Sequence, residues 1–98
     1  MKPNILRGKI LNFLREIYPE GADERTIVSI FFEYHKLDHI IDALVYLSDK
    51  GYSVRKETPH PYREQEKIRI YKIAPSGIDL VEGNIDNDPG ITIIREGV

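Results

Sequence analysis

The chain has 98 residues, of which 41% are hydrophobic and 31% are charged, and its formal net charge is −2. This size and composition predict one globular domain with a small core rather than a disordered chain. Cysteine is absent, which excludes disulfides, thiolate metal ligands and a cysteine nucleophile. No apolar run approaches membrane-spanning length and the sequence shows no signal-peptide core, so we expect a cytoplasmic protein.

The net charge hides an uneven distribution along the chain. Residues 50–72 carry seven Lys/Arg against three Asp/Glu, whereas the segments before and after them are net acidic. Local potential rather than total charge attracts a polyanion. The basic segment is therefore the first candidate for contact with phosphate groups.

The first half of the chain has the pattern of three amphipathic helices. Apolar residues recur at intervals of three and four positions, and this spacing predicts helices over residues 4–17, 23–34 and 36–50. A short polar break at His35-Lys36 separates the second helix from the third. We expect the third helix to bury Leu37, Ile40, Leu44 and Leu47.

The second half begins with a change of period. Asp23 is a suitable N-cap for the second helix. Gly51 stands just past the end of the third helix, where a left-handed residue is expected. After Gly51 the apolar period changes from about 3.6 to 2, which predicts a hairpin over residues 52–73. Pro75 and Gly83 then frame a short final helix. In the tail, the sequence of residues 91–94 is strand-like.

This order of elements predicts an α+β fold in the layout of a winged helix: a three-helix bundle with a two-stranded β-hairpin wing and a short C-terminal helix. Two stretches resemble the winged helix-turn-helix superfamily. Tyr71-Lys72-Ile73-Ala74-Pro75-Ser76-Gly77 resembles the return of the second wing strand to the core, and residues 43–52 resemble the end of a recognition helix. The resemblance covers residues 4–83, so we expect a winged helix-turn-helix domain over residues 1–83 and a C-terminal tail over 84–98.

A narrower resemblance connects the chain to small winged-helix proteins encoded in Mu-like prophages. The matching features are the segment Ile78-Asp79-Leu80-Val81-Glu82-Gly83 and the Pro89-Gly90 pair that follows it. This resemblance implies a prophage-encoded protein and gives it no more specific role.

The winged-helix resemblance implies a DNA-binding transcriptional regulator. In most such proteins the third helix enters the major groove and the wing contacts the backbone. We therefore expect helix 36–50 and wing 52–73 to bind double-stranded DNA. The candidate contact residues are Lys36, His39, Asp42, Ala43, Tyr46, Arg55, Lys56, Arg63, Lys67 and Arg69.

The outward face of the third helix is unfavourable for that role. Asp38 and Asp42 would lie near phosphates, and the helix has neither an arginine to pair with guanine nor a glutamine to pair with adenine. Aspartate can still accept a hydrogen bond from cytosine. The alternative hypothesis is a winged-helix module that binds another protein and does not bind DNA.

The chain has more apolar surface than one small domain readily covers. On the hairpin we expect Val54, Tyr71 and Ile73 to face the core, which leaves Ile68 and Ile70 on the opposite face. The tail or a second subunit could cover these isoleucines. We therefore expect a homodimer, with an interface formed by Val28, Phe32, Ile68, Ile70, Ile91 and Ile93.

Nothing in the sequence favours catalysis. His35 and His39 stand four positions apart with two aspartates nearby, but the predicted helix break beside His35 interrupts the shared helical face. No serine lies in a nucleophile motif, and the sequence contains no glycine-rich phosphate loop. We expect no metal site, no cofactor and no enzymatic activity.

Overall fold

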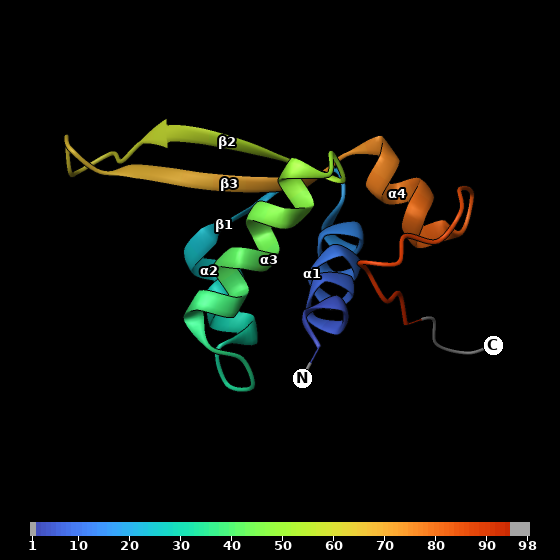
Figure 1. Cartoon of the computed structure of the whole chain (residues 1–98). Helices are drawn as coiled ribbons and strands as arrows, with labels where there is room; N and C mark the ends of the chain where they lie inside the picture. Colours follow the sequence, from blue (N-terminus) through green and yellow to red (C-terminus); the bar gives the residue numbers. More distant parts are fainter. Residues whose placement is uncertain (1, 95–98) are drawn as a thin grey trace.

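The computed structural model describes residues 2–94, which form four helices and a three-stranded antiparallel sheet (Figure 1). The elements are α1 (Pro3–Ile17), β1 (Ala22–Asp23), α2 (Glu24–Phe31), α3 (Leu37–Asp49), β2 (Ser53–Pro59), β3 (Lys67–Ile73) and α4 (Pro75–Glu82). The predicted α+β class is confirmed, and a hairpin follows the third helix as expected. Within the described residues no helix has both the length and the apolar composition that crossing a membrane requires.

The helix ends follow chemistry that is visible in the sequence. The Asp23 carboxylate accepts a hydrogen bond of 2.9 Å from the backbone N–H of Thr26 and caps α2 as predicted. Gly51 and Gly83 have φ angles of 83° and 79°, the left-handed conformation expected of glycine after a helix. Pro75 occupies the first turn of α4, where a missing N–H removes no helical hydrogen bond.

The second helix is shorter than the sequence predicts. It ends at Phe31 instead of Tyr34. The chain turns there because the backbone N–H groups of Tyr34 and His35 both donate to the Phe31 carbonyl, at 3.2 and 3.1 Å. The turn leaves Phe32 outside the helix with an exposed side chain.

The core lies where α1, α3 and β3 meet, with contributions from α2 and α4. Its largest fully buried side chains are Tyr71, Ile10, Leu11, Leu14, Ile27, Ile40, Leu44, Leu47, Ile73 and Leu80. Complete burial of one such aliphatic side chain contributes about 1.5–3 kcal/mol. This cluster fixes the relative positions of α1 and α3, and therefore decides which side of α3 faces outward.

The sheet has the order β1-β3-β2, and the β2–β3 hairpin projects beyond the helices on the side of α2 and α3 (Figure 1). Ser53 lies opposite Ile73 and Val54 lies opposite Lys72. Ser53, Tyr71 and Ile73 are buried, whereas Val54 is 56% exposed. The prediction that Val54 faces the core is wrong, because the register places it on the same face as Lys72. The short strand β1, which the sequence did not indicate, pairs with β3 through Ala22 and Asp23.

The described part of the tail, up to residue 94, runs back along α1. The Thr92 N–H donates to the Asn4 carbonyl at 3.1 Å, and the Arg7 guanidinium donates to the Gly90 carbonyl at 3.1 Å. This path requires Gly8, because a Cβ at that position would collide with the Thr92 carbonyl oxygen. Residues 91–94 pair with no strand of the described chain, so the strand prediction is wrong for them. Residues 95–98 of the expected tail lie outside the described residues.

Candidate functional site

The outward side of α3 is acidic and apolar. At 100° per residue, Leu37, Ile41 and Val45 form one stripe, and three aspartates form a second stripe beside it: Asp38, Asp42 and Asp49. Ile41 is half-buried, and the other members of both stripes are exposed. Residues 37–49 contain no Lys, Arg, Asn or Gln. Within residues 2–94, the three carboxylates make no ion pair and no side-chain hydrogen bond.

Two of the predicted DNA-contact residues on α3 are not exposed on its outward side. Ala43 is 2% exposed and belongs to the core, so the expectation that it faces outward is wrong. Tyr46 is half-buried, because the Arg7 guanidinium stacks 3.6 Å from the centre of its ring. His39, Asp42 and the preceding Lys36 are exposed as expected.

Ala43 and Tyr46 are turned inward because of the way in which α3 packs on its neighbours. The helix packs against α1, α2 and β2 and buries Ile40, Ala43, Leu44 and Leu47. This packing rotates Leu37 outward until it is 52% exposed. The prediction that Leu37 is buried is therefore wrong, and the outward positions of the stripe at Ile41 and Val45 were not predicted. The repeat of apolar residues at positions 37, 41 and 45, beside aspartates at 38, 42 and 49, is the signal that could have revealed this face.

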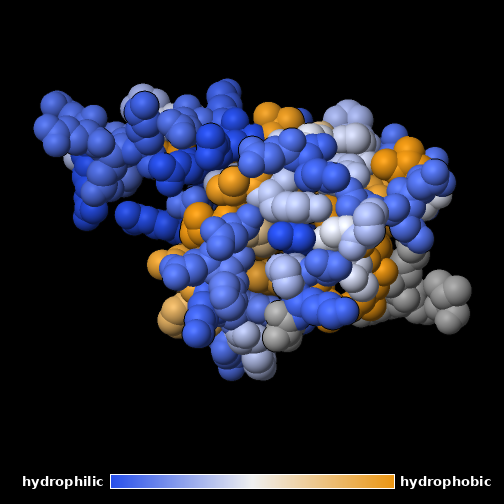
Figure 2. Space-filling model, viewed as in Figure 1, coloured by the Kyte–Doolittle hydropathy of each residue, from blue (hydrophilic) through white to orange (hydrophobic). Residues whose placement is uncertain are grey.

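An open groove of about 380 Å³ separates α2 from α3. Its lining residues are Glu24, Arg25, Val28, Ser29, Phe32, Leu37 and Ile41. Phe32 is 66% exposed at its edge. Figure 2 shows hydrophobic side chains over α2 and α3, beneath the mostly hydrophilic hairpin. We call this surface the α2–α3 face, and it comprises Val28, Phe32, Leu37, Ile41, Val45, Asp38, Asp42 and Asp49.

Several of the predicted wing cations are already paired with carboxylates. Arg63 lies 3.2 Å from Glu66, and Lys67 lies 3.7 Å from Glu57. Arg69 lies 3.5 Å from the Glu24 carboxylate and 3.6 Å from that of Glu57. All of these pairs are at least partly exposed, so each contributes little to stability. Their main effect is to reduce the positive potential of the hairpin.

Three cations of the hairpin have no carboxylate partner among residues 2–94: Arg55, Lys56 and Lys72. Arg55 lies opposite Tyr71 on the face of the hairpin that points toward the helices. Lys56 and Lys72 lie on the opposite face, together with Val54, Ile68 and Ile70. We call this second surface the hairpin outer face.

The residues predicted to form a dimer interface fall into three places. Val28 and Phe32 belong to the α2–α3 face, and Ile68 and Ile70 are half-buried on the hairpin outer face. Ile91 is 5% exposed within the core, so its assignment to an exposed interface is wrong. It is buried because the tail lies against α1. Ile93 is half-buried against the same core. The homodimer itself stays a prediction.

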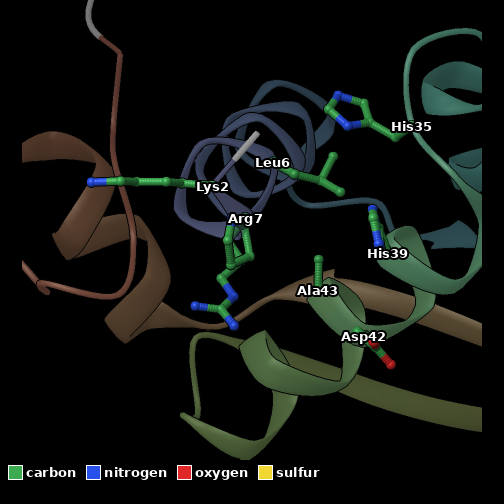
Figure 3. A pocket seen from close by; sticks show the side chains of 8 residues that line it. Lys2, Leu6, Arg7, His35, His39, Asp42 and Ala43 are labelled. Carbon is green, nitrogen blue, oxygen red and sulfur yellow. The ribbon is translucent and has the colours of Figure 1, made fainter.

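A second hollow, of about 290 Å³, lies between the start of α1 and the start of α3 (Figure 3). Lys2, Pro3, Leu6, Arg7, His35, His39, Asp42 and Ala43 line it. Its charged groups do not converge, because Lys2 extends to one side and the Asp42 carboxylate points to the other (Figure 3). The hollow therefore offers no single point at which an ion would be held.

The two histidines form no metal centre with their neighbours. In residues 2–94, no group of three or more His, Cys, Asp or Glu side chains is placed to hold a metal ion. Burial lowers the pKa of His35, and the positive charge of Lys9 lowers it further. Both effects favour the neutral form of the His35 side chain.

Comparison of the chain with protein-family models, with curated proteins and with solved structures finds no match. The class of protein is that of a small α+β fold in which an antiparallel hairpin follows the third helix. Evidence about function comes from its surfaces.

Proposed function

We propose that the chain is a winged helix-turn-helix protein whose α2–α3 face binds another protein and not DNA bases. The order of the elements and the sheet order β1-β3-β2 support the winged-helix topology. The observation that carries the function is the outward side of α3. It presents apolar side chains beside carboxylates that have no partner within residues 2–94, where a DNA-reading helix presents cations and amides.

Electrostatics argues against inserting this helix into a groove of DNA. The duplex carries about one negative charge per 1.7 Å of its axis, and affinity comes mainly from cations that neutralise those charges. Asp38, Asp42 and Asp49 would each approach phosphates without a neighbouring cation on α3. Like charges brought together at an interface cost several kcal/mol. A protein partner with complementary charge removes this cost.

The apolar part of the face supports the same conclusion. Phe32 is 66% exposed and stands beside a groove whose other lining residues include Val28, Leu37 and Ile41. Aromatic anchors near the centre of an interface commonly contribute at least 2 kcal/mol to binding. A surface with an exposed aromatic ring, an aliphatic groove and a polar edge is typical of protein interfaces.

A photocrosslinking amino acid tests this proposal. Benzoylphenylalanine is placed at position 32 on the α2–α3 face and, as a control, at position 62, where Tyr62 is 90% exposed at the hairpin tip. Illumination of cells that make the protein should give a protein adduct from position 32 and none from position 62. An adduct with DNA at position 32, or no adduct from that position, would contradict the proposal.

A second candidate function is phosphate contact through the hairpin. It is favoured by the three hairpin cations that have no carboxylate partner in the described part of the chain, Arg55, Lys56 and Lys72. Such contact would be independent of sequence, since phosphates carry no base information. If the chain is a DNA-binding regulator, as the sequence predicted, its contact with DNA would come from the hairpin and not from α3.

A further inference from the structure

The apolar stripe of the α2–α3 face has the length of a helix-binding site. The exposed apolar stripe of α3 runs from Leu37 to Val45, which spans roughly 12 Å at the helical rise of 1.5 Å per residue. Three side chains of a partner helix at positions i, i+4 and i+7 span almost the same length. The groove between α2 and α3 lies directly beside this stripe.

Carboxylates line the α3 edge of this site. Asp38, Asp42 and Asp49 run along the α3 edge, and none of them has a partner within residues 2–94. Among the described residues that line the groove, Arg25 is the one cation, and its guanidinium lies 3.8 Å from the Glu66 carboxylate. A partner helix seated on the apolar stripe would therefore place its flanking residues against a row of free carboxylates.

We infer that the occupant of the α2–α3 face is a basic amphipathic helix of another protein. Its apolar side chains would enter the groove beside Phe32 and Ile41, and its lysines or arginines would meet Asp38 and Asp42. This inference rests on the proposed function and names the partner of that site. Complementary charge of this kind speeds association and excludes acidic partners.

A second copy of the chain fits the site poorly. If two copies met symmetrically through this face, the aspartate stripe of each would come close to that of the other. The hairpin outer face has the required basic and apolar character in Lys56, Lys72 and Val54, but it is a strand surface and not a helix. The groove between two helices is better matched by a third helix, which buries its stripe along the whole length of the groove.

The test uses two designed peptides and the full-length chain. Each peptide has about 18 residues, long enough to be helical, with leucines at i, i+4 and i+7; one has lysines on the flanking positions and the other has glutamates there. Binding is measured by fluorescence anisotropy at low and at physiological salt. We expect the lysine peptide to bind with 1:1 stoichiometry and the glutamate peptide to bind at least about tenfold more weakly.

Four variants, checked for helicity by circular dichroism, locate the binding site. Phe32→Asp should lower the affinity for the lysine peptide by about tenfold or more. The double variant Asp38→Asn with Asp42→Asn should lower this affinity by about three- to tenfold and make it less dependent on salt. Tyr62→Asp and Glu64→Gln make comparable changes at the exposed hairpin tip, an aromatic side chain to aspartate and a carboxylate to an amide, and should leave binding unchanged.

Four results would overturn the inference: no binding of the lysine peptide, equal binding of the two peptides, undiminished binding to the Phe32→Asp variant, or a wild-type dimer in sedimentation that Phe32→Asp dissociates. The last result would make a second copy the occupant. If the lysine peptide fails while crosslinking from position 32 captures a protein, the basic helix is rejected and the proposed function stands. If both experiments fail, the proposed function is rejected as well.

Discussion

The Tyr52 hydroxyl donates a hydrogen bond of 2.7 Å to the Asp88 carboxylate and joins the start of the hairpin to the tail. The same carboxylate accepts a hydrogen bond of 2.7 Å from the Gly90 N–H and lies 3.2 Å from the Lys50 ammonium. Asp88 is 8% exposed. Its three donors therefore hold a buried charge at the place where the tail turns toward α1.

We predict that Asp88→Asn destabilises the protein at neutral pH and has little effect in acid. The Tyr52 hydroxyl, and after it the Gly90 N–H and Lys50, keep the pKa of Asp88 below its usual value of 3.8, although burial opposes them. A depressed pKa stabilises the folded state above the unfolded value, and this contribution is lost as the pH falls through the folded pKa. Urea denaturation should show a loss of about 2–3 kcal/mol at pH 7, which shrinks below about pH 4.

The exposed neighbour Asp86 is the control for that experiment. Asp86→Asn should change the free energy of unfolding by no more than about 0.5 kcal/mol at either pH. A loss for Asp88→Asn that stays constant down to pH 2 would contradict the linkage.

Tyr52 should produce the opposite dependence at alkaline pH. The hydrogen bond to Asp88, followed by burial and by the negative charge of Asp88, raises the pKa of Tyr52 to about 12. Its contribution is complete below the unfolded value of 10.0 and is lost as the pH rises from there toward 12. The difference in unfolding free energy between wild type and Tyr52→Phe should therefore fall over this interval. Tyr62→Phe, at the exposed hairpin tip, should show no such change.

Gly8→Ala should destabilise the protein, against the usual trend for a helix interior. Replacing a helical glycine by alanine normally stabilises by about 0.5–1 kcal/mol. Here the added methyl group would collide with the Thr92 carbonyl oxygen and displace the tail. Chemical denaturation should show a lower midpoint for Gly8→Ala and almost none of this effect for Lys9→Ala, an exposed position in the same turn. A stabilised Gly8→Ala variant would show that the tail does not lie on α1.

Much of the fold could be predicted from the sequence because local signals and packing agree. The Asp23 cap, the left-handed Gly51 and Gly83, and the alternation from Tyr71 to Ile73 each have a local cause. The tail could not be predicted in this way. Its isoleucines suit a strand, but the space that Gly8 leaves on α1 depends on tertiary packing.

The surface was harder to predict than the fold. Apolar residues surround much of α3, so periodicity alone leaves the rotation of the helix uncertain by about one position, or 100°. That rotation places Ala43 inside and Leu37 outside. The ion pairs Lys67–Glu57 and Arg69–Glu24 depend on the strand register and on the position of α2. A count of charges along the sequence cannot predict either of these.

Adjacent substitutions on α3 test this rotation. Ala43→Gln should cost at least about 1–3 kcal/mol, because it overfills the core and buries an amide without a partner. Asp42→Gln, at the exposed neighbouring position, should change stability by no more than about 0.5 kcal/mol. If Ala43 faced a DNA groove instead, both changes would be tolerated. Urea denaturation of the two variants decides between these orientations.

The hairpin cations test the second candidate function, by titration of a labelled random DNA duplex at several salt concentrations. If the hairpin contacts phosphates, Lys56→Ala with Lys72→Ala should weaken binding to every sequence, and should lower the slope of log affinity against log salt by up to about 0.9 for each lost contact. Arg63→Ala with Lys67→Ala should have a smaller effect, because these side chains must first leave Glu66 and Glu57 to reach a phosphate. Equal losses in the two double variants would show that only net charge matters. A wild-type protein that does not bind the duplex at low salt would exclude phosphate contact through the hairpin, and would leave the α2–α3 face as the candidate site.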